Sequence, residues 1–232
     1  MLQGKVVIVT GGFGALGRVV AAEAAKAGAK VAVLDFAPNA PDGLQASLGA
    51  DSLLVGGVDL SKEASAKDAA DKVKAKFGRI DAVFNIAGGF SWETVEGGSL
   101  ATWDKLYTLN VVTTRNMIVA ALPSLLASGA GRVVNVGANG AMKAATGMGA
   151  YAASKSGVHK LTESLAEEFK GKITVNAVLP SMIDTPVNRA DMPDADFTKW
   201  VQPAQIASLM IYLASNEAGA VTGALIPIVG GL

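Results

Sequence analysis

The chain has 232 residues, half of them hydrophobic, and it contains no cysteine and one histidine. Twenty basic side chains balance twenty acidic ones, so no positive field is available for a nucleic-acid backbone and little charge opposes self-association. These counts exclude disulfides, thiolate catalysis, sulfur-ligated metal sites and multi-histidine metal sites. The length favours a single domain over residues 1–232 with a large core.

The first residues, from Met1 onward, lead directly into a short apolar strand, so we expect no signal peptide. We also expect no membrane span, because no apolar run reaches the roughly 20 residues that a bilayer requires. The expected setting is a reducing, soluble compartment, the cytoplasm.

Short apolar runs bounded by glycine, proline or aspartate alternate with longer periodic segments. The predicted strands are 5–10, 30–34, 53–58, 81–86, 131–136, 172–179 and 224–229. The predicted helices are 18–27, 61–77 with Ser61 as its cap, one long or two shorter helices within 100–127, 151–169 and 203–214. This alternation predicts an α/β fold: a single doubly wound, Rossmann-like parallel sheet with helices on both faces. The polar segment 181–202 leaves the carboxyl end of a strand, where it would form a surface loop or a substrate lid.

A glycine-rich loop, Thr10 to Gly17, follows the first strand and opens the first helix. Glycine allows the backbone to approach a pyrophosphate, and the amino end of the helix stabilises its charge. Asp35 ends the next strand, where a carboxylate can bind ribose hydroxyls and repel a 2′-phosphate. The pair predicts a dinucleotide site that favours NAD(H) over NADP(H), although Arg18 lies close to the loop.

Tyr151 and Lys155 are four residues apart, so on a helix both project from one face. A nearby cation favours a phenolate, and we therefore expect Lys155 to lower the pKa of Tyr151. The same spacing also occurs by chance on ordinary helices.

Together these motifs resemble the short-chain dehydrogenase/reductase family over nearly the whole chain. The glycine loop is similar to the cofactor loop of the family, with Ala15 where glycine is usual, and the segment from Asn85 to Gly88 resembles its Asn-Asn-Ala-Gly segment. Asp59 and Leu60 are similar to the pair that flanks the adenine ring, and Pro180 begins a segment similar to the loop that contacts the nicotinamide. The cofactor-binding residues that the resemblance implies are Gly11, Phe13, Gly14, Leu16, Gly17, Asp35, Phe36, Asp59, Leu60, Asn85, Ala87, Gly88, Tyr151, Lys155, Pro180, Ile183 and Thr185.

The resemblance also implies a mechanism. Tyr151 would exchange a proton with the substrate oxygen as hydride moves to or from the nicotinamide, and Lys155 would bind the nicotinamide ribose. Asn110 matches the family's helix asparagine, which holds a water that links the lysine to solvent. These three are the implied catalytic residues. Family members pair through the long helix around 106–126 and the Tyr151 helix, which implies a homodimer or a homotetramer.

One position departs from the family pattern. Ala138 stands thirteen residues before Tyr151, where a serine usually donates a hydrogen bond to the substrate carbonyl. Losing such a donor typically costs about 10²–10³ in rate. Asn139 or Thr146 could replace it, the substrate could be an imine that needs no such donor, or catalysis could have been lost.

A narrower resemblance bears on this choice. The glycine loop, the segment before Tyr151 and segment 179–200 look like those of dihydropteridine reductases, which also lack the serine and reduce a C=N system. Asn85 and Asn110 instead follow the ordinary alcohol dehydrogenase pattern.

Apolar side chains near strand ends and in the lid could line a substrate pocket. The candidates are Phe90, Trp92, Ala138, Asn139, Met148 and Met182, with Met192 and Trp200 as further lid residues. His159, eight residues after Tyr151, is expected to be a packed or interface residue. The sequence thus predicts an oxidoreductase that transfers hydride between nicotinamide and a small, fairly apolar alcohol or ketone. Reduction of a C=N bond and non-catalytic dinucleotide sensing are the alternatives.

Overall fold

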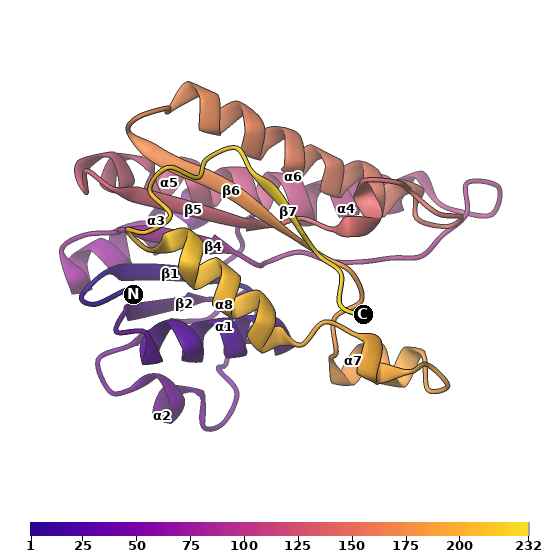
Figure 1. Ribbon diagram of the computed structural model, residues 1–232, viewed down its shortest axis with the longest axis horizontal. Helices are drawn as coiled ribbons and strands as arrows, with labels where there is room; N and C mark the ends of the chain where they lie inside the picture. Colours follow the sequence, from indigo (N-terminus) through magenta and orange to yellow (C-terminus); the bar gives the residue numbers. More distant parts are fainter. Residues whose placement is uncertain (232) are drawn as a thin grey trace.

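The computed structural model describes residues 1–231 and contains one seven-stranded sheet, ordered β3-β2-β1-β4-β5-β6-β7, in which each neighbouring pair is parallel. Figure 1 shows the strands running side by side between layers of helices. The strands are β1 Val6–Thr10, β2 Lys30–Leu34, β3 Leu53–Val55, β4 Ala82–Asn85, β5 Gly131–Val136, β6 Ile173–Pro180 and β7 Leu225–Ile228. The predicted doubly wound α/β fold is confirmed.

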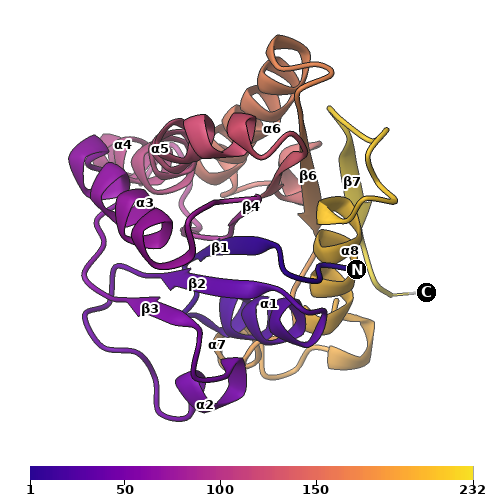
Figure 2. The same cartoon turned by 90° about the vertical axis from the view of Figure 1, so that its left-hand side faces the viewer.

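Helices cover both faces of the sheet (Figure 2). The helices are α1 Ala15–Lys26, α2 Leu44–Leu48, α3 Glu63–Phe77, α4 Leu100–Tyr107, α5 Thr113–Ala127, α6 Gly149–Glu168, α7 Pro186–Asp191 and α8 Pro203–Ala214. Helices α1 and α8 pack together on one face, whereas α3, α5 and α6 cover the other. Alternate side chains of β1 enter the two cores: Val7 and Val9 face α1 and α8, and Val6 and Ile8 face α3 and α5.

The segment 100–127 is one continuous helical stretch in which a π-helical turn, η1 (Thr108–Val112), joins α4 to α5. At 28 residues with a mean hydropathy of 1.2, this stretch is long and apolar enough to cross a membrane by length and composition alone. Half of its most apolar window is buried inside the protein, and α5 packs on α3, β4 and β5. The stretch is therefore a core helix of the sheet.

Three local predictions differ from the structure. Ser61 is not the cap of α3, because its hydroxyl donates to Asp59 Oδ1 at 2.6 Å and Lys62 occupies the N-cap position. Strand β3 ends at Val55, three residues early, and the short helix α2 was not predicted. Helix α1 begins at Ala15 and not at Arg18.

The segment 181–202 is folded back on itself at the carboxyl end of β6. Its two ends are joined where Val201 N donates to Met182 O and Asp184 N donates to Val201 O, both at 2.9 Å. The Asp184 carboxylate also accepts hydrogen bonds from Arg189 Nε and Nη2 and from Gln202 Nε2, at 2.5–2.8 Å. These bonds close the neck of the predicted lid and lower the pKa of Asp184 to about 2, chiefly through Arg189.

Candidate active site

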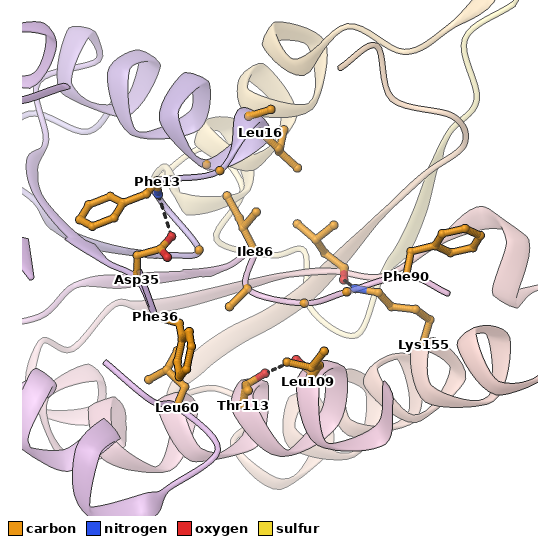
Figure 3. Close-up of a pocket in the computed structure, with 18 of the residues that line it drawn as sticks. Phe13, Leu16, Asp35, Phe36, Leu60, Ile86, Phe90, Leu109, Thr113 and Lys155 are labelled. Atoms are coloured by element: carbon orange, nitrogen blue, oxygen red, sulfur yellow. Dashed lines mark hydrogen bonds between the residues drawn. The ribbon is translucent and has the colours of Figure 1, made fainter. Parts of the chain in front are cut away.

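A cleft of about 1080 Å³ opens at the carboxyl ends of β1, β2, β4, β5 and β6. The strand order reverses between β1 and β4, and ligands of open parallel sheets bind at such a point. The residues that line it and were predicted to bind the cofactor are Gly11, Phe13, Gly14, Leu16, Gly17, Asp35, Phe36, Asp59, Leu60, Ala87, Gly88, Tyr151, Lys155, Pro180, Ile183 and Thr185. Figure 3 shows Asp35 and Phe36 toward one end and Lys155 and Phe90 toward the other.

The glycine loop is packed too closely for side chains at several positions. Gly11 has a φ of +63°, and a Cβ there would lie 2.8 Å from the Ala87 backbone. A Cβ on Gly17 would overlap the Gly11 carbonyl oxygen, and one on Gly12 would overlap Val33. The loop therefore holds α1 directly against β1 and β4, so the amino end of α1 points into the cleft. This cradle fits the pyrophosphate of a dinucleotide.

Asp35 is fixed at the far end of the cleft by backbone donors. Its Oδ2 accepts from Phe13 N at 2.8 Å (Figure 3), and its Oδ1 accepts from Ala37 N at 2.9 Å. The carboxylate is thus anchored between the glycine loop and the end of β2. Nearby, Asp59 Oδ1 accepts from both the amide and the hydroxyl of Ser61, and these bonds lower the pKa of Asp59.

Buried polar side chains hold the loop that follows β4. Thr10 Oγ1 accepts from Ile86 N and Ala87 N at 3.0 and 3.1 Å. Asn85 is buried beneath this loop and donates to Asn135 Oδ1 at 2.9 Å. Asn85 therefore supports the cleft from below and does not line it. This position disagrees with the predicted direct contact between Asn85 and the cofactor.

Asn110 lies in the π-helical turn and is fully buried. Its side chain accepts from Gly89 N at 2.9 Å and donates to Gly89 O at 3.0 Å and to Ser154 Oγ at 2.9 Å. A Cβ on Gly88 would lie 2.5 Å from Asn110 Oδ1 and 3.4 Å from Lys155 Nζ. Asn110 thus joins the β4 loop to the helix that carries the tyrosine and lysine. π-turns recur at functional sites.

Tyr151 and Lys155 project from α6 into the inner end of the cleft. Lys155 is buried and its Nζ donates to Val136 O at 2.8 Å (Figure 3). Burial lowers the pKa of Lys155 to about 8 and raises the pKa of Tyr151 to about 12. The predicted lowering of the Tyr151 pKa is wrong for this structure, because loss of hydration on burial raises that pKa.

The β4–α4 connection carries two exposed aromatic side chains, of which Phe90 lines the cleft and Trp92 does not. Phe90, 58 % exposed, contacts Tyr151 edge-to-face with ring centroids 4.9 Å apart. Trp92 donates from Nε1 to Thr146 O at 3.1 Å, and Glu93 N donates to Gly147 O at 2.9 Å. The two loops that flank Tyr151 are therefore fastened to each other.

The remaining predicted pocket residues do not line the cleft: Trp92, Ala138, Asn139, Met148, Met182, Met192 and Trp200. Met148 is the N-cap residue of α6, and its Cε lies 3.4 Å from the Cβ position of Gly140. Ala138 is buried and its amide donates to His159 Nε2 at 3.3 Å. Residues that also line the cleft but were missed are Ala15, Leu34, Ala37, Val58, Ser61, Ile86, Gly89, Asp104, Lys105, Thr108, Leu109, Thr113, Val136, Gly137 and Ser181. Five of these, from Asp104 to Thr113, lie on the 100–127 helix, and the apolar periodicity of that helix gave no sign of a cleft-facing edge.

Among the described residues, 1–231, no group of three or more histidine or acidic side chains is placed to hold a metal ion. Chemically, the cleft combines an anion cradle, an anchored carboxylate, a half-buried phenol and a buried ammonium on the same helix. These features define a dinucleotide-binding α/β enzyme.

Comparison with known proteins identifies the family. A model described as short chain dehydrogenase matches residues 5–196. The chain belongs to the short-chain dehydrogenase/reductase family and is an oxidoreductase of that family. The relatives support NAD(P)-dependent oxidoreduction of alcohols and ketones.

Two curated relatives and one solved structure are similar to this chain over nearly its whole length. D-threitol dehydrogenase of Mycolicibacterium smegmatis is 34 % identical over 242 residues, covering 99 % of this chain and 93 % of the relative. A 2,5-dichloro-2,5-cyclohexadiene-1,4-diol dehydrogenase of Sphingobium indicum is 32 % identical over 247 residues, covering 99 % and 96 %. Carveol dehydrogenase from Mycobacterium avium, solved in complex with NAD, has a TM-score of 0.86 at 26 % identity, covering 98 % and 96 % of the two chains.

Proposed function

We propose that this chain transfers hydride between NAD(H) and a small, mostly apolar secondary alcohol or ketone, with Tyr151 as the proton donor and acceptor. The single observation that carries the proposal is the placement of Tyr151 and Lys155 at the inner end of the dinucleotide cleft. A bound nicotinamide dinucleotide supplies or accepts the hydride. The glycine loop would hold its pyrophosphate, and Asp35 its adenosine ribose.

The chain's own groups then account for the proton. Tyr151 is a neutral phenol at pH 7, since the ordinary pKa of a phenol is about 10 and burial raises the pKa of Tyr151 to about 12. A neutral phenol can donate a proton to a substrate oxygen as negative charge develops there. Lys155, tied to Val136 O, would stabilise the phenolate that remains and exchange protons along the Asn110 side of the cleft.

A preference for NAD(H) over NADP(H) is proposed from Asp35. Two backbone amides direct its carboxylate at the end of β2, where a 2′-phosphate would meet a fixed negative charge. Phe36 follows it and is exposed, and it offers no cation to a phosphate.

The substrate class is proposed from Phe90 and Trp92. Both rings are more than half exposed, Phe90 beside Tyr151 and Trp92 over Gly147. Exposed aromatic faces stabilise a flat apolar partner by stacking and by burying its surface. Ala138 is buried and offers no hydroxyl where one is usual in the family. A cyclic alcohol or ketone suits this wall better than a polyol or a charged substrate.

Reduction of a C=N bond, as in dihydropteridine reductases, is a second candidate that Ala138 favours. The reacting C=N bond of such a substrate has no carbonyl oxygen that a hydroxyl donor would have to hold. A dinucleotide sensor is disfavoured, because binding alone would not require the phenol of Tyr151.

The test is NADH oxidation over a panel of cyclic ketones, linear ketones, imines and quinonoid dihydropterin, with Tyr151→Phe as the control. We expect turnover of cyclic ketones that Tyr151→Phe abolishes while NADH still binds. Turnover that survives Tyr151→Phe would sink the acid–base role. Turnover of imines alone would move the assignment to C=N reduction, and turnover of nothing would favour the sensor.

A further inference from the structure

His159 is the one histidine of the chain, and the proposed proton transfer makes no use of it. It lies on α6, one turn beyond Lys155, and is 4 % exposed. Its ring fills the space above Gly137, because a Cβ on that residue would overlap Nε2 and lie 2.7 Å from Cδ2. The ring is therefore wedged between α6 and the end of β5.

The ring acts there as a hydrogen-bond acceptor. Ala138 N donates to His159 Nε2 at 3.3 Å. A ring nitrogen can accept only when it carries no proton, so the ring is neutral and its proton sits on Nδ1. Burial and the charge of Lys155 both lower the pKa of His159, which agrees with this state.

The end of β5 is held by three bonds in succession. Val136 O accepts from Lys155 Nζ at 2.8 Å, Gly137 N donates to Val178 O at 2.9 Å, and Ala138 N donates to His159. Two of the three partners are side chains of α6. The bond to His159 is the last one before the chain turns into the loop 139–148 beside Tyr151.

We propose that His159 is a positioning residue of the catalytic centre: as a neutral acceptor it holds the end of β5, and with it the Val136 carbonyl that orients Lys155. The inference rests on the proposed function. The Ala138 side chain has no hydroxyl that could fix this strand end, and the hydrogen bond from the Ala138 amide to His159 fixes it instead.

Protonation of His159 would break this arrangement. A protonated Nε2 would face the Ala138 amide with one donor against another, and it would add a second positive charge one turn from Lys155. The charged groups that act on the ring are Lys155, Lys160 and Glu163, all on α6. On the strand side the ring meets the backbone of Gly137 and Ala138, with Leu179 of β6 also against Gly137, and none of these titrates.

Two substitutions distinguish the role of His159 as a hydrogen-bond acceptor from its role in filling space. His159→Gln places an amide oxygen near the position of Nε2 and does not titrate. His159→Leu fills the space but leaves the Ala138 amide without a partner. Lys160→Gln, on the exposed side of the same helix, removes a charge that acts on the ring but keeps the acceptor, and it therefore controls for charge effects alone.

The first readout needs no substrate. In protein labelled with ¹³C and ¹⁵N at histidine, one set of ring signals should report the Nδ1–H tautomer and a midpoint below 6.5, with the Ala138 amide signal following the same midpoint. That amide should lose protection from hydrogen exchange in His159→Leu and keep it in His159→Gln. An Nε2–H tautomer, or equal protection in both variants, would overturn the inference whether or not the proposed function holds.

The second readout is the pH profile of kcat/KM with any substrate that the wild type turns over. We expect wild type and Lys160→Gln to lose activity at acid pH, where His159 becomes protonated, while His159→Gln stays flat there and His159→Leu falls about tenfold at every pH. The NADH dissociation constant should change less than about twofold in all three variants. An acid limb that persists in His159→Gln, or wild-type kcat/KM in His159→Leu, contradicts the positioning role. Absence of turnover by the wild type would count against the proposed function, and the ring tautomer and amide exchange would still decide the hydrogen bond.

Discussion

Asp35 Oδ2 accepts a hydrogen bond from Phe13 N over 2.8 Å, so the carboxylate at the end of β2 and the glycine loop after β1 form one rigid edge of the cleft. The bond directs the negative charge of Asp35 at the place where an adenosine ribose would lie. Cofactor choice should therefore depend on the charge of this side chain more than on its shape.

Asp35→Asn keeps an oxygen acceptor for Phe13 N and removes the charge. We expect the ratio of NADPH to NADH dissociation constants to fall at least about tenfold, because the repulsion of a 2′-phosphate is lost. Fluorescence titration with each cofactor measures the ratio. Asp59→Asn is the matched control, since Lys62 lies 3.3 Å from that carboxylate and already offsets its charge. A wild-type preference for NADPH would refute the role given to Asp35.

Lys155 should make the stability of the cofactor-free protein depend on pH. Its pKa is lowered from 10.5 to about 8 by burial, so between these values the unfolded chain binds more protons than the folded one. The free energy of unfolding should then rise as the pH increases from about 8 toward 10, by no more than about 3 kcal/mol. Tyr151, whose pKa is raised to about 12, gives the opposite slope above pH 10.

Urea denaturation at pH 7.5, 8.5 and 9.5 measures this slope. Lys155→Met removes the ammonium and should flatten the rise relative to wild type, whereas Lys26→Met, on an exposed side chain, should follow the wild-type curve. Identical slopes for wild type and Lys155→Met would show that the lysine is better hydrated than its buried position indicates.

The fold and the glycine-loop end of the cleft follow from local sequence signals. Strand β5 was predicted with its observed bounds, because a β-branched run beginning at glycine has few alternatives. Tyr151 and Lys155 share a helix face by spacing alone, and Asp35 ends a strand that stops at a polar residue.

Contacts between distant segments could not be predicted in this way. The pairing of Ala138 with His159 joins residues 21 positions apart on two elements, and no periodicity in either element marks it. The raised pKa of Tyr151 was missed for a related reason, since burial depends on how Phe90 and the neighbouring loops cover the ring. The sequence predicts that Ser154 lies on a helix but does not predict the hydrogen bond that it accepts from Asn110.

Gly137 and His159 should be energetically coupled. A Cβ on Gly137 would overlap the imidazole, which is fixed between α6 and β5, so Gly137→Ala should lower the free energy of unfolding by about 1–3 kcal/mol. In the background of His159→Ala the same methyl group no longer overlaps the imidazole and meets Leu179 Cδ1 at 3.3 Å, so its added cost should fall below about 1 kcal/mol. Chemical denaturation of the four proteins gives the coupling, and simple additivity would contradict the close contact.

Phe90 should control which substrates reach Tyr151. Phe90→Ala removes the ring that lies 4.9 Å from the Tyr151 ring and forms an exposed apolar wall beside it. We expect kcat/KM for cyclic ketones to fall about tenfold, equivalent to about 1.4 kcal/mol of lost contact, with less than about threefold change for short linear ketones. For cyclic ketones, kcat/KM of Phe90→Leu should lie between those of wild type and Phe90→Ala, because leucine keeps apolar bulk without a flat face. Val95→Ala, an exposed side chain further along the same connection, is the control. If Phe90→Ala lowered kcat/KM equally for ring and chain substrates, Phe90 would act by holding Tyr151 in place and not by selecting the substrate.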